Sequence, residues 1–403
     1  MDDKKYSFGI VVIGYNNERG IERLLESISK VDYQGDFGIK LIISIDYSGN
    51  DTVKNIAEQF EWEHGEKIIV AHEKNLGLKK HILACGNYLN EYDLDAVAVL
   101  EDDIYVAPSM YNYMKNTVEF YENDPTVAGI SLYKHELDIL AKKRFEDYVD
   151  DSDVFFIQYA MSWGQIWLRD KWNSFMDWYE NENWKEMKNK EIPANIKAWT
   201  NSWLKFHIMY CIDRNLYFVY PRVSQATNFS DAGVHRSNVS NAMQVKMAME
   251  CKKNWNFTRI EDSMAVYDAF FENIIVKKYL KLDNVTINLN GYKRNYASKY
   301  VLSTAILPYK VVKSWGLSFR PIETNIFLNN SGNDIFLYDT ECSDKLNKSN
   351  DHLMRIFDYD LKGLDIRKKE NLKYVINSIY NSICYRFKDI KKKLKKWLYR
   401  REA

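Results

Sequence analysis

The chain has 403 residues, which is enough for two or three domains and too many for one small domain. Hydrophobic residues make up 46% and charged residues 28%, a composition that excludes a largely disordered chain. The formal net charge is zero, yet residues 384–403 contain nine Lys or Arg and only two Asp or Glu. Because this basic charge is gathered at one end, it argues against a nucleic-acid binder, whose basic residues would cover the fold.

Short β-branched runs alternate with helical patterns along the first quarter of the chain. Four predicted strands lie at 7–13, 41–45, 67–71 and 96–100, and apolar residues at helical spacing separate them. This alternation predicts a doubly wound α/β fold, with a mostly parallel sheet and helices on both faces. Weaker patterns continue the sheet with candidate strands at 126–132, 153–159 and 217–223. After about residue 250 we expect an α-rich C-terminal extension, with a helix at 262–281, a strand at 284–289 and a hairpin within 325–340.

Polar clusters follow three of the predicted strands. They are Tyr15-Asn16-Asn17, Asp46-Tyr47-Ser48 and Glu101-Asp102-Asp103. The carboxyl ends of parallel strands meet at one edge of a sheet, and ligands of open α/β sheets bind beyond that edge. The three clusters are therefore predicted to face one ligand.

The triplet Glu101-Asp102-Asp103 is the strongest chemical signal in the chain. Three adjacent carboxylates repel one another, and a strand end tolerates them when a cation shares their charge. Mg²⁺ or Mn²⁺ held by one or two carboxylates together with substrate phosphates is the usual arrangement. The alternative is a solvated acidic turn.

Two neighbouring segments offer further contacts to a ligand. Asp46 or Ser48 would accept hydrogen bonds from a uracil or a ribose, although this segment also reads as an ordinary helix start. Lys79 and Lys80 lie at a predicted helix N-terminus, where the helix dipole disfavours cations unless an anion is near. We expect Lys79 to contact a phosphate, and a solvated lysine is the alternative.

Several segments, in order, resemble a known enzyme family. VVIGYNNERGIERLLESI, LIISIDYSGND, HEKNLGLKKHIL and VAVLEDDIYVAPSM resemble the nucleotide-binding half of GT-A glycosyltransferases. The last of these is most similar to the animal N-acetylglucosaminyltransferase I and O-mannose N-acetylglucosaminyltransferase group. MSWGQIWLRDKW at 161–172 and YPRVSQATNFSDAGVHR at 220–236 resemble elements of family 2-like bacterial polysaccharide glycosyltransferases.

The resemblance implies roles for individual residues. It makes Asp103 a metal ligand, with His235 as a second ligand of the metal or the diphosphate, and places Glu101 and Asp102 near the ribose and the donor sugar. Asp46 becomes the carboxylate that reads the base. Donor contacts are also expected from Gly14, Tyr15, Asn16, Ser48, Lys79 and Trp163, with core packing as the alternative for Trp163.

One part of the pattern is missing. The animal enzymes carry the general base in a Trp-Asp-Asp-Trp segment, whereas the nearest match here is Trp-Thr-Asn-Ser-Trp at 199–203. Inverting transfer needs a base near the acceptor hydroxyl. Asp231, Asp153 and Asp151 are candidates only because they lie near the other motifs.

The resemblance also implies domain boundaries and an activity. We expect a GT-A catalytic domain at 1–245, divided near residue 125 into nucleotide and acceptor halves, an accessory region at 246–370 and a basic amphipathic helix at 371–403. The expected activity is Mn²⁺- or Mg²⁺-dependent transfer from a UDP-sugar to a bacterial surface glycan or lipid-linked acceptor. The alternatives are a sugar-phosphate nucleotidyltransferase and a catalytically silent sugar-nucleotide or glycan-binding protein.

The C-terminal segment and the cysteines bear on location. Five scattered cysteines without a CxxC pair, and no signal peptide or spanning segment, favour the cytoplasm. Apolar residues recur at helical spacing towards the end of the chain, namely Ile376, Ile379, Tyr380, Ile383, Phe387, Ile390, Leu394, Trp397 and Leu398. The lysines between them predict a helix lying on an anionic membrane at the inner face of the cell. Packing on the catalytic domain, or pairing with a second copy as a homo-oligomer, is the alternative.

Overall fold

A computed structural model describes most of the chain. The described residues are 5–187, 190–200, 202–229, 243–294, 296–344, 350–361, 368–369, 371–373, 375–377 and 380. The chain divides into two compact units, Met1–Asn347 and Lys348–Ala403. We describe each unit by itself.

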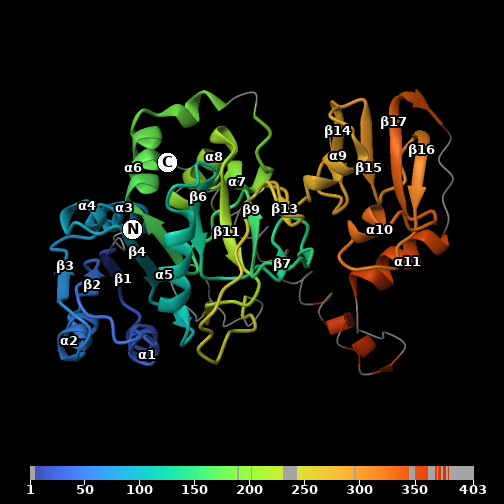
Figure 1. Cartoon of the computed structure of the whole chain (residues 1–403). Helices are drawn as coiled ribbons and strands as arrows, with labels where there is room; N and C mark the ends of the chain where they lie inside the picture. Colours follow the sequence, from blue (N-terminus) through green and yellow to red (C-terminus); the bar gives the residue numbers. More distant parts are fainter. Residues whose placement is uncertain are drawn as a thin grey trace, which may run out of the picture. The chain divides into compact units, whose positions relative to one another are not determined.

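The first unit begins with alternating strands and helices, as predicted (Figure 1). In chain order these elements are β1 (Phe8–Gly14), α1 (Glu18–Ser29), β2 (Lys40–Ile45), α2 (Thr52–Gln59), β3 (Lys67–Ala71), α3 (Leu78–Gly86), α4 (Tyr88–Glu91) and β4 (Ala96–Glu101). The four predicted strands are confirmed. Local chemistry sets the helix starts: Asn17 caps α1 through its side chain, and Gly77 precedes α3 with a φ of 73°.

The next segment completes the main sheet. The strands of this segment, in chain order, are β5 (Ile104–Val106), β6 (Val127–Ser131), β7 (Leu137–Asp138), β8 (Lys143–Arg144), β9 (Val154–Ile157), β10 (Gln165–Leu168), β11 (Tyr217–Pro221), β12 (Ala226–Asn228) and β13 (Val266–Tyr267), of which β6, β9, β10, β11 and β13 join the main sheet. Its helices are α5 (Met110–Tyr121), α6 (Arg169–Glu180), the 3₁₀ turn η1 (Asn183–Lys185), α7 (Ala194–Ala198) and α8 (Trp203–Arg214). The sheet therefore extends past the predicted domain boundary at residue 245.

The described residues form a nine-stranded sheet in the order β13-β9-β11-β6-β10-β4-β1-β2-β3. The pairs β4-β1, β1-β2, β2-β3, β6-β11 and β9-β13 are parallel, whereas β10 runs antiparallel between β4 and β6. The carboxyl ends of β1, β2, β3, β4 and β6 thus share one edge with the start of β10. This edge is where a ligand of an open α/β sheet is expected.

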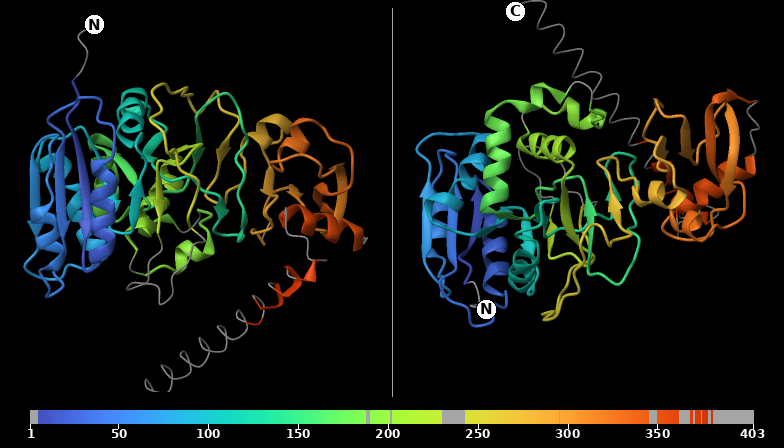
Figure 2. Two further views of the ribbon diagram at one scale, coloured as in Figure 1. Left: turned by 90° about the horizontal axis from the view of Figure 1, so that it is seen from below. Right: turned by 45° about the horizontal axis from the view of Figure 1, so that its top comes forward.

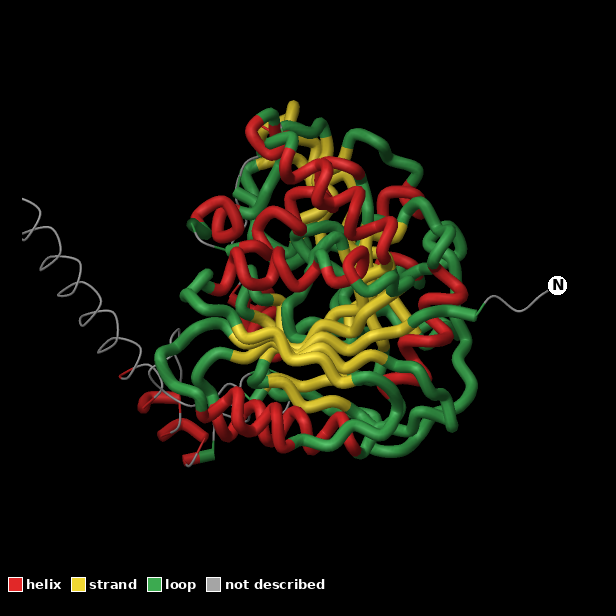
Figure 3. Tube along the Cα trace, turned by 90° about the vertical axis from the view of Figure 1, so that its left-hand side faces the viewer, coloured by secondary structure: helices red, strands yellow, loops and turns green. Residues whose placement is uncertain are grey.

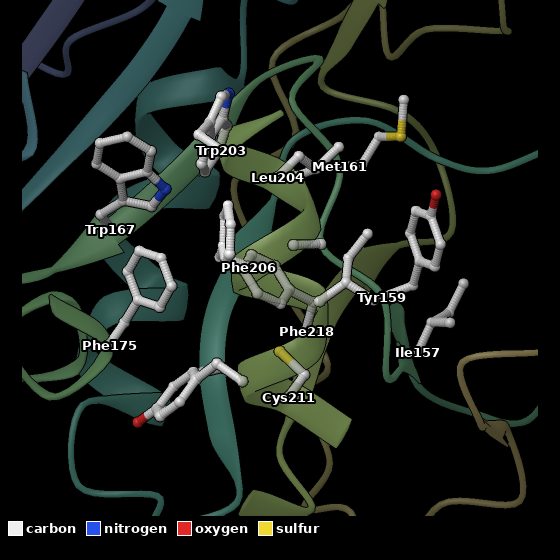
Figure 4. Close-up of a cluster of buried hydrophobic side chains, with 14 of the residues drawn as sticks. Ile157, Tyr159, Met161, Trp167, Phe175, Trp203, Leu204, Phe206, Cys211 and Phe218 are labelled. Carbon is white, nitrogen blue, oxygen red and sulfur yellow. The ribbon is translucent and has the colours of Figure 1, made fainter. Parts of the chain in front are cut away.

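Hydrophobic side chains cover both faces of the sheet, and helices lie on either side of its twisted strands (Figure 3). On one face, α3, α6 and α8 pack over an aromatic cluster in which Trp167 stacks on Trp172 with ring centroids 3.9 Å apart. Figure 4 shows Trp167 and Phe175 of this cluster beside Trp203 and Phe206 of α8. Helices α1, α2 and α5 contribute to the other face. The two-sided burial explains why β1 and β4 are continuous apolar runs.

A second, four-stranded sheet follows, and its strands form the orange group in Figure 2. Within the described residues its order is β14-β15-β17-β16, with β14 (Val285–Asn288), β15 (Tyr300–Ser303), β16 (Tyr309–Trp315) and β17 (Ile335–Ser343). Helices α9 (Ile275–Leu280) and α10 (Thr324–Phe327) accompany a small core of their own. The prediction of an α-rich extension is wrong for this segment, because its β-branched strands pair with one another across long loops.

The second unit contains α11 (Asn350–Asp360). Of the helices that the structure describes, none has the length and apolar character needed to span a membrane. Of the predicted amphipathic helix at 371–403, the structure describes residues 371–373, 375–377 and 380, which are helical, and the basic part at 384–403 lies outside the described residues. Its membrane association therefore stays a prediction.

Candidate active site

The acidic triplet lies at the carboxyl edge of the main sheet, as predicted. Glu101 is the last residue of β4, and Asp102 and Asp103 form the turn into β5. β5 pairs antiparallel with β12, and the N–H of Phe229 donates to the carbonyl oxygen of Asp103 at 2.9 Å. The turn is therefore braced by a strand more than a hundred residues later in the sequence.

Helix α1 holds the same turn from the other side. The Nδ2 of Asn17 donates to Oδ1 of Asp102 at 3.3 Å, while its Oδ1 accepts from the Gly20 N–H at 3.1 Å. The sequence places Asn17 in a polar cluster at this edge without a role of its own, and it does not single out Gly20. The N-cap position of Asn17, just before a helical pattern, was the available signal, but it predicts a cap and not a partner.

The segment Ser162-Trp163-Gly164 lies beside Glu101. β10 begins at Gln165, which pairs with Val99, so the residues just before it run alongside the end of β4. The hydroxyl of Ser162 hydrogen-bonds to the Glu101 carboxyl. Gly164 has a φ of 93°, and a Cβ there would lie 3.1 Å from Cβ of Leu132, so a side chain would be both strained and crowded.

Trp163 fills the end of the sheet next to this turn. It is half-buried and packs against the hydrophobic clusters of both faces. Its ring meets that of Tyr133 edge-on, with centroids 4.9 Å apart. The structure thus gives Trp163 a packing role beside Glu101, and a contact with the donor stays a prediction.

Crowding of the three carboxyl groups has an electrostatic consequence. The pKa of Glu101 is raised to about 8, first by burial and then by the charges of Asp103 and Asp102. Two negative neighbours and poor hydration both disfavour ionisation of Glu101. A cation at the turn would reverse this effect.

Asp46 is buried and engages the loop that follows β3. Its Oδ1 accepts from the N–H groups of Tyr47 at 2.9 Å and Leu76 at 2.8 Å, and its Oδ2 accepts from the Gly77 N–H at 2.9 Å. Asn75 adds a bond from Nδ2 to the Tyr47 carbonyl oxygen. Asp46 therefore joins two loops of the ligand edge, whether or not it also reads a base.

The remaining donor-side candidates differ in environment. Gly14 ends β1, and its carbonyl oxygen accepts from the Asp46 N–H at 3.0 Å. Tyr15 is half-buried and Asn16 is exposed at the same edge, while the hydroxyl of half-buried Ser48 donates to the Asn50 carbonyl oxygen at 3.2 Å. The structure brings these residues to one edge, as the strand pattern predicts.

Lys79 has a different environment from the one that we expected. Its Nζ lies 4.2 Å from the ring centroid of Phe206 in α8 and 5.1 Å from that of Tyr179 in α6. These are cation–π distances. The side chain is thus engaged with the aromatic cluster, and its contact with a phosphate stays a prediction.

Comparison with known proteins identifies the domain that carries this site. Residues 9–206 match the family model described as glycosyl transferase family 2. This part of the chain is a family 2 glycosyltransferase domain. The match runs from β1 into α8 and includes both the acidic turn and Ser162-Trp163-Gly164.

Three solved structures are similar to about half of this chain. TarS from S. aureus is 14% identical over 55% of this chain and 36% of its own, with a TM-score of 0.35. The mannosyltransferase PcManGT from Pyrobaculum calidifontis, in complex with GDP-Man and Mn²⁺, is 15% identical over 55% of this chain and 59% of its own, with a TM-score of 0.32. GlyE from Streptococcus pneumoniae is 13% identical over 54% and 46%, with a TM-score of 0.33. Less than two thirds of each protein is covered, and the assignment of the domain depends on the family model. No curated protein sequence matches the chain.

The candidate bases Asp151 and Asp153 do not lie beside the acidic turn. Asp153 forms an ion pair with Lys252 and accepts from the Asn256 N–H, and Asp151 is exposed. Both precede β9, which is four strands from β4 in the sheet, or about 19 Å at the usual strand spacing. Asp231 lies outside the described residues.

The acidic turn fits a divalent cation that is shared with substrate phosphates. No group of three His, Cys, Asp or Glu side chains forms a complete metal site among the described residues. Carboxylates from one turn together with phosphate oxygens would supply the hard oxygen ligands that Mg²⁺ and Mn²⁺ prefer. His235, the second predicted ligand, lies outside the described residues.

Proposed function

We propose that the glycosyltransferase moves a sugar from a UDP-sugar, with Mn²⁺ or Mg²⁺ and with inversion, to a bacterial surface glycan or a lipid-linked acceptor. Capsule, O-antigen or a related polysaccharide is the expected product class. One observation carries the proposal: within a family 2 domain, three crowded carboxyl groups stand at the carboxyl end of β4.

Crowding at the turn supports the metal. Burial and neighbouring charge raise the pKa of Glu101, so the turn holds more negative charge than its surroundings stabilise. Asp103 is the proposed ligand, with Asp102 and Glu101 beside the ribose and the donor sugar. When bound, the ion would neutralise charge that develops on the departing nucleoside diphosphate.

The loops around Asp46 support a nucleotide on the neighbouring strands. Asp46 draws the loop after β3 against the loop after β2, and Tyr15 lies at the end of the adjacent β1. These loops present aromatic and polar groups at the edge where α/β sheets bind nucleotides. The choice of UDP comes from the resemblance to UDP-sugar enzymes.

Inverting transfer requires a general base beside the acceptor hydroxyl, and we assign this role to none of the described residues. Helix α8 begins at Trp203, in the segment that resembles the base-bearing segment of the animal enzymes, and Thr200 and Ser202 stand there without a carboxylate. The anomeric configuration of the product, measured by NMR, tests this part of the proposal separately. A retained configuration would reject inversion and leave the transferase assignment intact.

A direct test measures turnover of UDP- and GDP-sugars with Mn²⁺, with Mg²⁺ and with EDTA. Asp103→Ala should abolish hydrolysis and transfer while the protein stays folded, because the change removes a turn carboxylate and no core volume. Glu58→Ala, which removes an exposed carboxylate from α2, is the matched control and should keep full activity. Activity that survives both Asp103→Ala and EDTA would reject the metal-dependent reaction.

The basic C-terminal segment supports a location at the inner face of the cell membrane. Its apolar stripe and interleaved lysines have the pattern of a helix that lies among anionic headgroups. Each basic residue near such a surface contributes about 1 kcal/mol. Attachment there would place the enzyme beside a lipid-linked acceptor.

A further inference from the structure

The loop between β1 and α1 contains a side chain with two different partners. Asn17 caps α1, because its Oδ1 accepts from the Gly20 N–H at 3.1 Å. The Nδ2 of the same amide donates to Oδ1 of Asp102 at 3.3 Å. One planar amide therefore links the start of a helix to the middle carboxylate of the acidic turn.

The backbone of α1 lies against the backbone of the acidic turn at Gly20. A Cβ on Gly20 would lie 2.4 Å from the carbonyl oxygen of Asp102, so no larger residue fits without movement. One turn later, the guanidinium of Arg23 lies 3.7 Å from the ring centroid of Phe229, whose N–H donates to the Asp103 carbonyl oxygen. The first two turns of α1 thus form a rigid support behind the acidic turn.

Two favourable interactions link the Asp102 carboxylate to the start of α1. The N-terminus of α1 carries partial positive charge, and an N–H donated to a carboxylate makes a stronger bond than one between neutral groups. Both interactions hold the Asp102 carboxylate toward α1. The direction of Asp102 is therefore determined before a donor arrives.

We infer that Asn17 is a positioning residue for the transfer reaction: its amide fixes Asp102 against α1 and so preorganises the acidic turn for the donor. This inference rests on the proposed function of the turn. A side chain held in its productive orientation loses less freedom on binding, which favours affinity and turnover.

Substitutions at Asn17 separate this role from helix capping. Asn17→Ser keeps an oxygen that caps α1 but removes the donor to Asp102, so the melting temperature should stay near that of the wild type. Turnover should nevertheless fall about 10- to 100-fold, the range expected when a reacting group is misplaced by about 1 Å. Asn17→Asp also keeps the cap, and it should not restore turnover because it offers Asp102 no donor.

A matched control comes from the next loop of the sheet. The Oδ1 of Asn50 accepts from the Thr52 N–H at 2.9 Å, the same kind of local bond that Asn17 makes with Gly20. Asn50→Ser should leave turnover within twofold of the wild type. An equal loss in Asn17→Ser and Asn50→Ser would assign the effect to loop structure and overturn the inference.

The decisive measurement is a double-mutant cycle in UDP affinity, measured by calorimetry with Mn²⁺. If Asn17 acts through Asp102, Asn17→Ser should weaken UDP binding about tenfold in the wild-type background and less than twofold in the Asp102→Ala background. Additive effects would overturn the role of Asn17 while leaving the proposed function standing. A wild-type protein that neither binds UDP nor turns over UDP-sugars would overturn both.

Discussion

Replacing Asp46 with alanine should cost stability as well as nucleotide affinity. The Asp46 carboxylate is only 4% exposed and accepts three backbone N–H groups, from Tyr47, Leu76 and Gly77. A hydrogen bond to a charged group contributes about 1.5–3 kcal/mol. Because the loop amides of Leu76 and Gly77 are half-buried, water would recover part of this, and we expect a loss of about 3 kcal/mol in the free energy of unfolding.

Urea unfolding of the purified protein measures this loss, and calorimetry measures the affinity for UDP. Asp46→Asn should show a smaller loss of stability, because its amide oxygen still accepts from a backbone N–H. Some loss should remain, because the amide NH2 group then faces another N–H group. UDP binding by Asp46→Ala should weaken by about 1–3 kcal/mol, since the loop after β3 is released even if no direct contact is lost.

Ser48→Ala is the control for the same loop. Its hydroxyl makes one bond, to the Asn50 carbonyl oxygen at 3.2 Å, so its removal should change stability by less than about 0.5 kcal/mol. If Asp46→Ala unfolds at the same urea concentration as the wild type, the three amide bonds do not stabilise the loops. An unchanged UDP affinity would in addition remove Asp46 from the donor site.

Three further predictions follow from the structure and the sequence. Lys79→Met should keep the wild-type affinity for UDP, because its ammonium lies on aromatic rings, and a tenfold loss in calorimetry would instead support the phosphate contact. Burial lowers the pKa of His81 to about 4, and that of His135 and His207 to about 3, from an ordinary value of 6.5. Between these values the unfolded chain binds protons at the three histidines, whereas the folded protein keeps them neutral. The free energy of unfolding should therefore fall as the pH drops from 6.5 toward 4, by up to about 1.4 kcal/mol per pH unit for each histidine. Because His207 is one of three such residues, His207→Phe should reduce this slope by about a third, as measured by urea unfolding at several pH values. Deleting residues 384–403 should leave donor hydrolysis intact and abolish cosedimentation with anionic liposomes, and equal sedimentation of the two proteins would show that this segment is not the anchor.

The sequence by itself determined the strands and the edge on which the site lies. β1 and β4 are continuous apolar runs followed at once by polar residues, and such runs predict buried parallel strands. Because parallel strands end at a common edge, the convergence of Tyr15, Asp46 and the acidic triplet follows from topology. The family assignment agrees with the motifs that the sequence shows.

The C-terminal region shows where this reasoning fails. The sequence predicts an α-rich extension with one strand at 284–289 and a hairpin within 325–340, whereas β14, β15, β16 and β17 form a separate four-stranded sheet. β16 is mostly exposed and has no clear alternation of apolar and polar residues. Its strand conformation depends on hydrogen bonds to β17, about twenty residues later, which no local pattern records.

Only the tertiary structure decided which partner each polar side chain takes. Asp46 reads as a ligand or a helix start, yet its oxygens bind the amides of Leu76 and Gly77, thirty residues away. Asn17 reads as a cap, yet its second amide atom holds Asp102. A sequence pattern records secondary structure through local periodicity, whereas these contacts depend on how two loops pack at the sheet edge, and packing brings together residues whose separation along the chain carries no periodic signal.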